Sequence, residues 1–218
     1  MDIYFVANLS ETAGRADAAF RVSGNAPELW DPITGDRRDL PEFHFEQGRT
    51  VVPLQFAAKQ SWFVVFQKPI GNSNASSRKA SNRKNFRDFS RISALTGPWE
   101  VSFDPRWGGP GTVTFAELQD WITRAEEGIK YFSGTAIYRM TFDATDTAAT
   151  HLDLGVVKNL ARVKLNGEDR GIVWTAPWRV KLGRSLHTHG NRLEIEVVNL
   201  WPNRLIGDGT LPDRKSVV

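Results

Sequence analysis

The chain has 218 residues, of which 40% are hydrophobic and 24% charged, a composition typical of a soluble globular protein with room for one large domain or two small ones. It contains no cysteine, which excludes disulfides, thiol nucleophiles and zinc–thiolate sites. No run of roughly 18 apolar residues is present, and residues 1–10 lack the basic start and apolar centre of a signal peptide. We therefore expect neither a membrane span nor an export signal in this chain.

Residues 1–69 show the patterning of an antiparallel β unit. Strands are expected at 2–9, 18–23, 50–56 and 61–67. The last of these contains an unbroken apolar run, which is typical of a buried strand. No helical period appears, and we interpret the unit as the tail of a sandwich that begins upstream. Because a strand-like pattern with Tyr4 and Val6 begins almost at once, residue 1 is expected to mark a cut within a longer protein.

Residues 70–92 are rich in Ser, Asn, Lys and Arg and poor in apolar side chains. Residues 72–92 carry a net charge of +5 within a chain of net charge +3, so the rest of the chain carries −2. This composition predicts a basic, flexible linker. Binding to nucleic acid or to an anionic surface is the alternative. Neither an aromatic β platform nor a recognition helix accompanies the segment, so we expect no nucleic-acid or membrane partner.

Residues 93–218 form a second unit that is expected to contain one short helix. Thr114 and Glu117 have the spacing of a capping box, and Gly128 occupies the position of a C-terminal cap. The apolar side chains with helical spacing between them are Phe115, Leu118, Ile122 and Ala125.

Strands surround this helix in the pattern of a β-sandwich. They are expected at 97–103, 135–142, 160–166, 171–174, 179–182 and 192–199. Asn166-Gly167 is a strong signal for a tight hairpin between two of them. Short strands with period-2 alternation at this spacing predict a sandwich or jelly roll, so the whole chain is expected to be all-β.

Four segments of the second unit carry a family resemblance. They are GPWEVSFDP (97–105), YFSGTAIYRMTF (131–142), LDLGVVKNLARVKLNGEDRGIVWTAPW (152–178) and NRLEIEVVNLWPNRLIGD (191–208). Together they resemble the galactose-binding-like jelly roll, the sugar-binding domain of family 2-type glycoside hydrolases. Segments 2–10, 28–35 and 199–208 are more narrowly similar to glycoside hydrolase family 106, the bacterial α-L-rhamnosidases.

The resemblance implies that this chain is a non-catalytic C-terminal portion of such an enzyme. In that family the matching segments follow a catalytic (β/α)8 barrel, which holds the catalytic carboxylates and a calcium ion and is missing here. Family members also continue into a closing strand, whereas this chain ends with residues 211–218, so the jelly roll is expected to lack that strand. The parent enzyme would be periplasmic, cell-surface or extracellular.

Three functions follow as alternatives. The chain supports the missing catalytic barrel and contacts a plant-type or rhamnose-containing carbohydrate, or it is an independent carbohydrate-binding module, or it binds anionic surfaces through the linker. An exposed apolar patch where a barrel would pack favours the first over the second. Binding that collapses with salt would favour the third.

No catalytic residue is assigned within the chain. Glycoside hydrolysis needs two convergent carboxylates, and none of the acidic residues has spacing that predicts such a pair. His187 and His189 lie in a turn without a third ligand, so no zinc site is expected. A structural calcium ion is compatible with a jelly roll, although no ligand pattern identifies one, and no other cofactor is expected.

Tryptophans in loops are the strongest candidates for sugar contact, because sugars stack their C–H faces on aromatic rings and loop tips commonly carry binding residues. The candidate carbohydrate-binding residues are Trp107, Trp174, Trp178, Trp201, Asn203, Arg204 and Asp208. An alternative role for Arg204 and Asp208 is an ion pair that braces their loop. Trp62 and Trp99 lie inside strands and are expected in the core.

Overall fold

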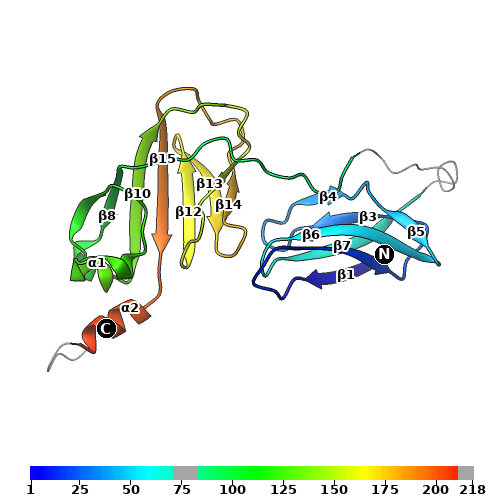
Figure 1. Ribbon diagram of the computed structural model, residues 1–218, viewed down its shortest axis with the longest axis horizontal. Helices are drawn as coiled ribbons and strands as arrows, with labels where there is room; N and C mark the ends of the chain where they lie inside the picture. Colours follow the sequence, from blue (N-terminus) through cyan, green and yellow to red (C-terminus); the bar gives the residue numbers. More distant parts are fainter. Residues whose placement is uncertain (71–82, 211–218) are drawn as a thin grey trace. The chain divides into compact units, whose positions relative to one another are not determined.

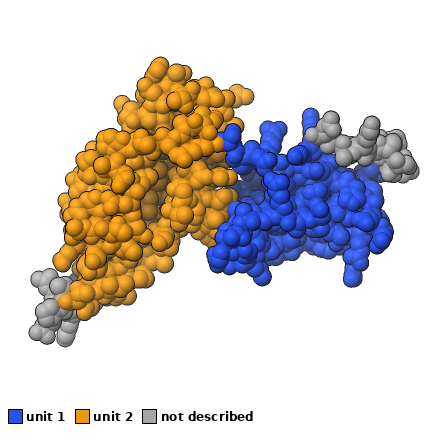
Figure 2. Space-filling view, viewed as in Figure 1, with its two compact units in different colours: residues 1–90 blue, residues 91–218 orange. Residues whose placement is uncertain are grey.

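The computed structural model describes residues 1–70 and 83–210 of the chain, which form two compact units, 1–90 and 91–218 (Figures 1 and 2). Both are built mainly from antiparallel strands. None of the helices in the described residues is long and apolar enough to cross a membrane. The expected all-β class is confirmed.

Unit 1 is built from a four-stranded and a three-stranded sheet. Its strands are β1 (Asp2–Ala7), β2 (Gly14–Phe20), β3 (Asn25–Trp30), β4 (Arg37–Asp39), β5 (His44–Glu46), β6 (Arg49–Phe56) and β7 (Ser61–Pro69). The strand orders are β1-β7-β3-β4 and β2-β6-β5. Alternate residues of β6 and β7, including Val52, Leu54, Val64 and Phe66, share one buried core. Unit 1 therefore has a two-sheet core of its own.

Composition assigned residues 83–88 to a flexible linker, but they pack against the strands and loops of unit 1. Asn85 is only 3% exposed. Its side chain accepts a hydrogen bond from the Glu42 backbone N–H at 2.8 Å and donates to the carbonyl oxygens of Glu42 at 2.6 Å and Pro53 at 3.1 Å. Phe86 lies 6.2 Å from Trp62, between ring centroids. These contacts order a polar segment that has little apolar surface to bury; the expected linker residues 71–82 lie outside the described residues.

Unit 2 contains a six-stranded and a two-stranded sheet. Its strands are β8 (Trp99–Phe103), β9 (Gly111–Phe115), β10 (Thr135–Phe142), β11 (His151–Asp153), β12 (Leu160–Leu165), β13 (Glu168–Val173), β14 (Arg179–Lys181) and β15 (Asn191–Val198). Its helical segments are η1 (Pro105–Trp107), η2 (Trp121–Thr123), α1 (Glu127–Lys130) and α2 (Pro202–Asp208). The large sheet has the order β13-β12-β15-β10-β8-β9, and β11 pairs with β14. Figure 1 shows β15 between β10 and β12.

The core of unit 2 lies on one face of the six-stranded sheet. Alternate residues Ala136 and Tyr138 of β10, Val163 of β12, and Leu193 and Ile195 of β15 belong to it. Trp99 is buried there and Trp62 in the core of unit 1, as expected. The outward residues between these core positions are left to form the opposite face of the sheet.

The expected helix across 114–128 is wrong. Phe115 ends strand β9, is fully buried, and packs against Phe103 and Tyr138 at centroid distances of 6.2 and 6.0 Å. Trp121, which was not on the expected apolar face, is the buried residue of η2, and its indole N–H donates to the Tyr138 hydroxyl. Sheet pairing and burial of these rings outweigh the local capping signal, because helix propensity is a weak preference. Only the four residues of α1 are α-helical near this position, and η2 adds one 3-10 turn.

We predict that Asn85→Ala destabilises unit 1. The change leaves the Glu42 N–H and the Pro53 carbonyl without the Asn85 partner in a buried position, at an expected cost of about 2–3 kcal/mol in the free energy of unfolding. Urea unfolding followed by tryptophan fluorescence measures it. Arg87→Ala in the same segment, at an exposed position, is the matched control. Equal urea midpoints of unfolding for the Asn85→Ala and Arg87→Ala variants would contradict a structural role for Asn85.

Candidate functional site

Strand pairing brings several loops of unit 2 to one end of the sandwich. Thr135 pairs with Val198, which also pairs with Leu160, while Ala136 pairs with Phe103. The strand ends at these positions therefore lie side by side. The segments that leave this end are 104–110, 154–159, 174–178 and 199–201. We call it the loop end of unit 2.

The four candidate tryptophans of unit 2 all lie at the loop end. Trp107, Trp174 and Trp201 are exposed by 54%, 56% and 52%, respectively. Trp178 is different, because it is half-buried and packs against the core. The structure thus leaves three tryptophans accessible at this end, of which two face each other. The indoles of Trp107 and Trp201 meet edge to face, with ring centroids 6.0 Å apart and an interplanar angle of 78°.

Two of the polar candidate residues on α2 form an ion pair with each other within the helix. Arg204 Nε lies 3.1 Å from Asp208 Oδ1, one helical turn away, which is the ion pair weighed as an alternative above. Gly207 lets α2 approach Tyr131 so closely that an added Cβ would lie 2.7 Å from the tyrosine Cβ. The Arg204 backbone N–H also donates to Ser133 Oγ at 3.0 Å. Asn203, on the same helix, is half-buried. None of Asn203, Arg204 and Asp208 lines the cleft described next.

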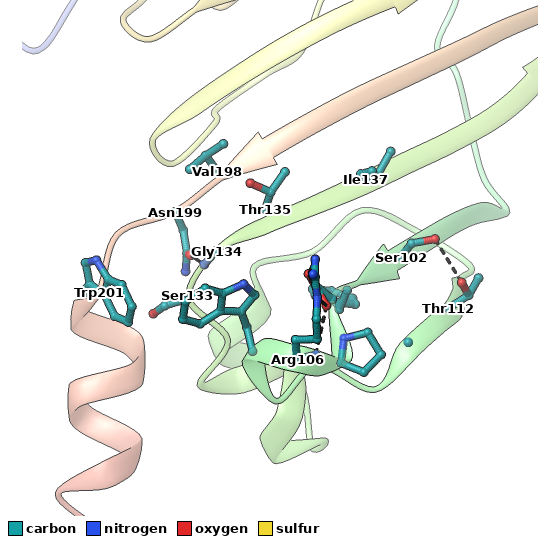
Figure 3. Close-up of a pocket in the computed structure, with 15 residues that line it drawn as sticks. Ser102, Arg106, Thr112, Ser133, Gly134, Thr135, Ile137, Val198, Asn199 and Trp201 are labelled. Carbon is teal, nitrogen blue, oxygen red and sulfur yellow. Dashed lines mark hydrogen bonds and ion pairs between the residues drawn. The ribbon is translucent and has the colours of Figure 1, made fainter. Parts of the chain in front are cut away.

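A cleft of about 810 Å³ opens beside the two facing tryptophans, on the outward face of the six-stranded sheet (Figure 3). Its floor is formed by outward residues of two strands. These are Thr135 and Ile137 of β10 and Val198 of β15. η1 and the start of α2 contribute walls. The remaining lining residues are Ser102, Phe103, Asp104, Pro105, Arg106, Trp107, Gly111, Thr112, Ser133, Gly134, Asn199 and Trp201.

One ion pair dominates the electrostatics of the cleft. The Arg106 guanidinium contacts both carboxylate oxygens of Asp104, the shortest distance being 2.7 Å from Nη2 to Oδ2. Asp104 Oδ1 also accepts the Arg106 backbone N–H at 2.9 Å and caps η1. The Arg106 side chain and backbone hold the pKa of Asp104 below its ordinary value. Asp104 is therefore an ionised, paired carboxylate and is unsuited to act as a general acid.

Sequence reasoning missed several residues of this cleft. Trp107 and Trp201 were selected as loop tryptophans, but Arg106, Thr135, Ile137 and Val198 were not. Ile137 and Val198 are apolar residues at outward positions of their strands, where alternation predicts polar side chains. That exception to the pattern is the signal that could have found the floor.

The described residues contain no group of three His, Cys, Asp or Glu side chains able to hold a metal ion. His189 Nδ1 lies 3.1 Å from Asp143, and His187 Nδ1 lies 3.5 Å from Asn166 Nδ2. Both histidines therefore have partners in the loops around them.

Comparison with known proteins shows what this chain is similar to. Residues 1–44 match the family model of glycoside hydrolase family 106, described as alpha-L-rhamnosidase. The structure matches a rhamnosidase from Novosphingobium sp. PP1Y with a TM-score of 0.82 and 39% sequence identity, over 94% of this chain. This region is rhamnosidase-like.

The rhamnosidase-like chain spans only part of each relative's length. It covers 19% of the Novosphingobium rhamnosidase. A putative beta-glucuronidase from Formosa agariphila is 45% identical over 123 residues, which are 54% of this chain and 11% of that protein. The chain is thus a glycoside hydrolase-related region that matches about a fifth or less of the length of these relatives.

We predict that Gly207→Ala displaces α2 and destabilises unit 2 by about 1–3 kcal/mol, because the new methyl group would overlap Tyr131. Gly209→Ala is the control, since its Cβ would meet no heavy atom closer than 3.4 Å. Urea unfolding gives the stabilities, and the NMR shifts of the Trp107 and Trp201 indole N–H groups report the position of α2. A Gly207→Ala variant as stable as the Gly209→Ala variant would contradict the close packing of α2.

Proposed function

We propose that this chain is a non-catalytic portion of a rhamnosidase-like glycoside hydrolase, where it docks through the loop end of unit 2 onto the catalytic part of the parent enzyme and contacts carbohydrate beside that surface. The observation that carries the proposal is the gathering of exposed apolar side chains at the loop end. A periplasmic, cell-surface or extracellular location of the parent is part of the same proposal.

The apolar patch at the loop end is formed by large side chains that are each more than half exposed. They are Ile122, Val156, Trp174, Leu200, Leu205 and Ile206. Ile122 belongs to this end because Asp120, two residues before it, has its Oδ2 3.3 Å from Lys158 Nζ. Lys158 lies in loop 154–159, which also holds Val156. At the opposite end of the strands, loops 143–150, 166–167 and 183–190 expose no large apolar side chain among the described residues, whereas the segment that follows β9 exposes Leu118. A concentration of exposed apolar side chains at one end is typical of a protein interaction surface.

The carboxyl groups support a non-catalytic role. Asp104 is the single carboxylate among the residues that line the cleft, whereas a glycosidase needs two flanking the scissile bond. A general acid also needs a raised pKa. Every carboxyl group of the described residues whose pKa departs clearly from its ordinary value departs downward, because basic side chains, hydroxyls or backbone N–H groups bond to it.

The purified chain is predicted to hydrolyse neither 4-nitrophenyl α-L-rhamnopyranoside nor 4-nitrophenyl β-D-glucuronide above the rate of a buffer blank. Release of 4-nitrophenol, followed by absorbance, measures it. Turnover that co-purifies with the chain and is lost in Asp104→Asn would overturn the non-catalytic assignment.

Docking is tested by complementation. We predict that the chain binds the Novosphingobium rhamnosidase from which the matching 19% has been removed, and that Leu205→Glu/Ile206→Glu weakens this binding at least tenfold by placing two charges in an apolar contact. Leu9→Glu/Ile33→Glu, at exposed apolar positions of unit 1, is the matched control. Size-exclusion chromatography and calorimetry give the affinity. Equal binding by both double variants would exclude the loop end as the docking surface.

An independent carbohydrate-binding module is the second candidate, favoured by the cleft and its two tryptophans. It requires sugar affinity without any docking partner, so a chain that binds sugar but does not bind the truncated rhamnosidase would favour this candidate over the first.

A further inference from the structure

We propose that the cleft on the outward face of the six-stranded sheet is a binding site for an uncharged pyranoside, held between the facing pair Trp107–Trp201 and the floor at Thr135 and Ile137. This proposal deepens the carbohydrate contact of the proposed function and rests on it. It assigns the contact to the sheet face and not to the α2 residues Asn203, Arg204 and Asp208.

The shape and polarity of the cleft suit one or two sugar rings. A volume of about 810 Å³ lies within the range of small-ligand sites, which are mostly apolar with a few converging polar groups. Ile137 and Val198 offer an apolar floor to the C–H face of a ring, and Trp201 offers an aromatic wall (Figure 3). Trp107 also lines the cleft and meets Trp201 edge to face. A flat apolar face next to polar edges is the surface that a pyranoside presents.

Polar groups at the cleft divide into those that the fold uses and those left for a ligand. Asn199 accepts the Gly134 N–H at 2.9 Å and donates to the Phe132 carbonyl at 2.8 Å, while Ser133 bridges Leu200 and α2. Within the described part of the chain, by contrast, the Thr135 hydroxyl and the indole N–H groups of Trp107 and Trp201 make no hydrogen bond. These three groups are the donors that sugar hydroxyls would meet.

The charges of the cleft favour a neutral ligand. Asp104 and Arg106 are the only charged side chains among its lining residues, and they form one ion pair of zero net charge. An acidic sugar would compete with Asp104 for the guanidinium and would be repelled by the carboxylate. A neutral sugar neither competes for the guanidinium nor is repelled by the carboxylate. Its hydroxyls can donate to Asp104 and accept from Arg106.

The cleft is held in shape before a ligand arrives. The Asp104 cap fixes η1, and Gly109 packs so tightly that an added Cβ would lie 2.6 Å from the Cβ of Phe103. Gly207 seats α2 against Tyr131. Binding therefore orders few side chains, which reduces its entropic cost.

The test uses two probes that differ in charge at one carbon, methyl β-D-glucopyranoside and methyl β-D-glucuronide, with methyl α-L-rhamnopyranoside as a further neutral sugar. Calorimetry and NMR titration of the full chain are expected to show at least one neutral glycoside binding, and the glucoside at least tenfold tighter than the glucuronide. Asp104→Asn is expected to reverse the order of that pair, because it leaves the Arg106 cation unpaired.

Variants locate the site. Thr135→Val, at an exposed strand position, is expected to weaken neutral-sugar binding about fivefold, and Trp201→Ala about tenfold. Trp174→Ala, which removes an exposed tryptophan of the loop end outside the cleft, is the control and is expected to change nothing.

Three outcomes would overturn the proposal. Binding that is lost in Trp174→Ala but kept in Thr135→Val and Trp201→Ala would place the sugar elsewhere and leave a carbohydrate contact standing. A glucuronide that binds as tightly as the glucoside would reject the neutral class. No detectable binding of any of the three glycosides would reject the site. Docking through Leu205 and Ile206 would still be tested by the complementation experiment.

Discussion

Asn199 holds the two proposed functional surfaces of unit 2 to the sheet. It follows the last residue of β15, and its side chain binds the backbone on both sides of Ser133, at Phe132 and Gly134, directly before β10 begins. Ser133 completes the junction by donating to the Leu200 carbonyl and accepting from the first turn of α2. Because the junction is half-buried, losing these bonds would leave backbone groups without partners. The orientation of Trp201 and of the apolar side chains of α2 depends on it.

The outward face of the six-stranded sheet has two chemically different regions. Toward the middle of the strands, Arg139, Lys164, Glu194 and Glu196 form a row of ion pairs at 2.6–3.0 Å across β10, β15 and β12. These pairs are half-buried and share Glu194 and Lys164, so each charge of the row has an opposite charge beside it. Toward the loop end the row gives way to Thr135, Ile137 and Val198, and the cleft lies there. The change from paired charges to an apolar floor is the surface feature on which the proposed ligand site rests.

The proposed docking patch and the proposed sugar site lie at the same end of one sandwich. The first uses Leu205 and Ile206 on α2, and the second uses Trp201 at the start of the same helix. Helix α2 is therefore the element through which docking could influence sugar contact. A region of this design would add affinity and position to a glycoside hydrolase while its chemistry resides elsewhere in the polypeptide.

The sequence alone determined the β class, most strand positions and the hairpin at Asn166-Gly167, whose φ angles of 54° and 84° fit the expected tight turn. These features follow from side-chain alternation and turn chemistry within a few residues. Only the tertiary structure decided that Phe115 lies in a strand and that Asn85 packs on unit 1. It also decided that Ile137 and Trp107 share a cleft with Trp201. Those outcomes depend on pairing and burial between residues far apart in the chain, where the energy gained by packing exceeds the local preferences that a sequence pattern records.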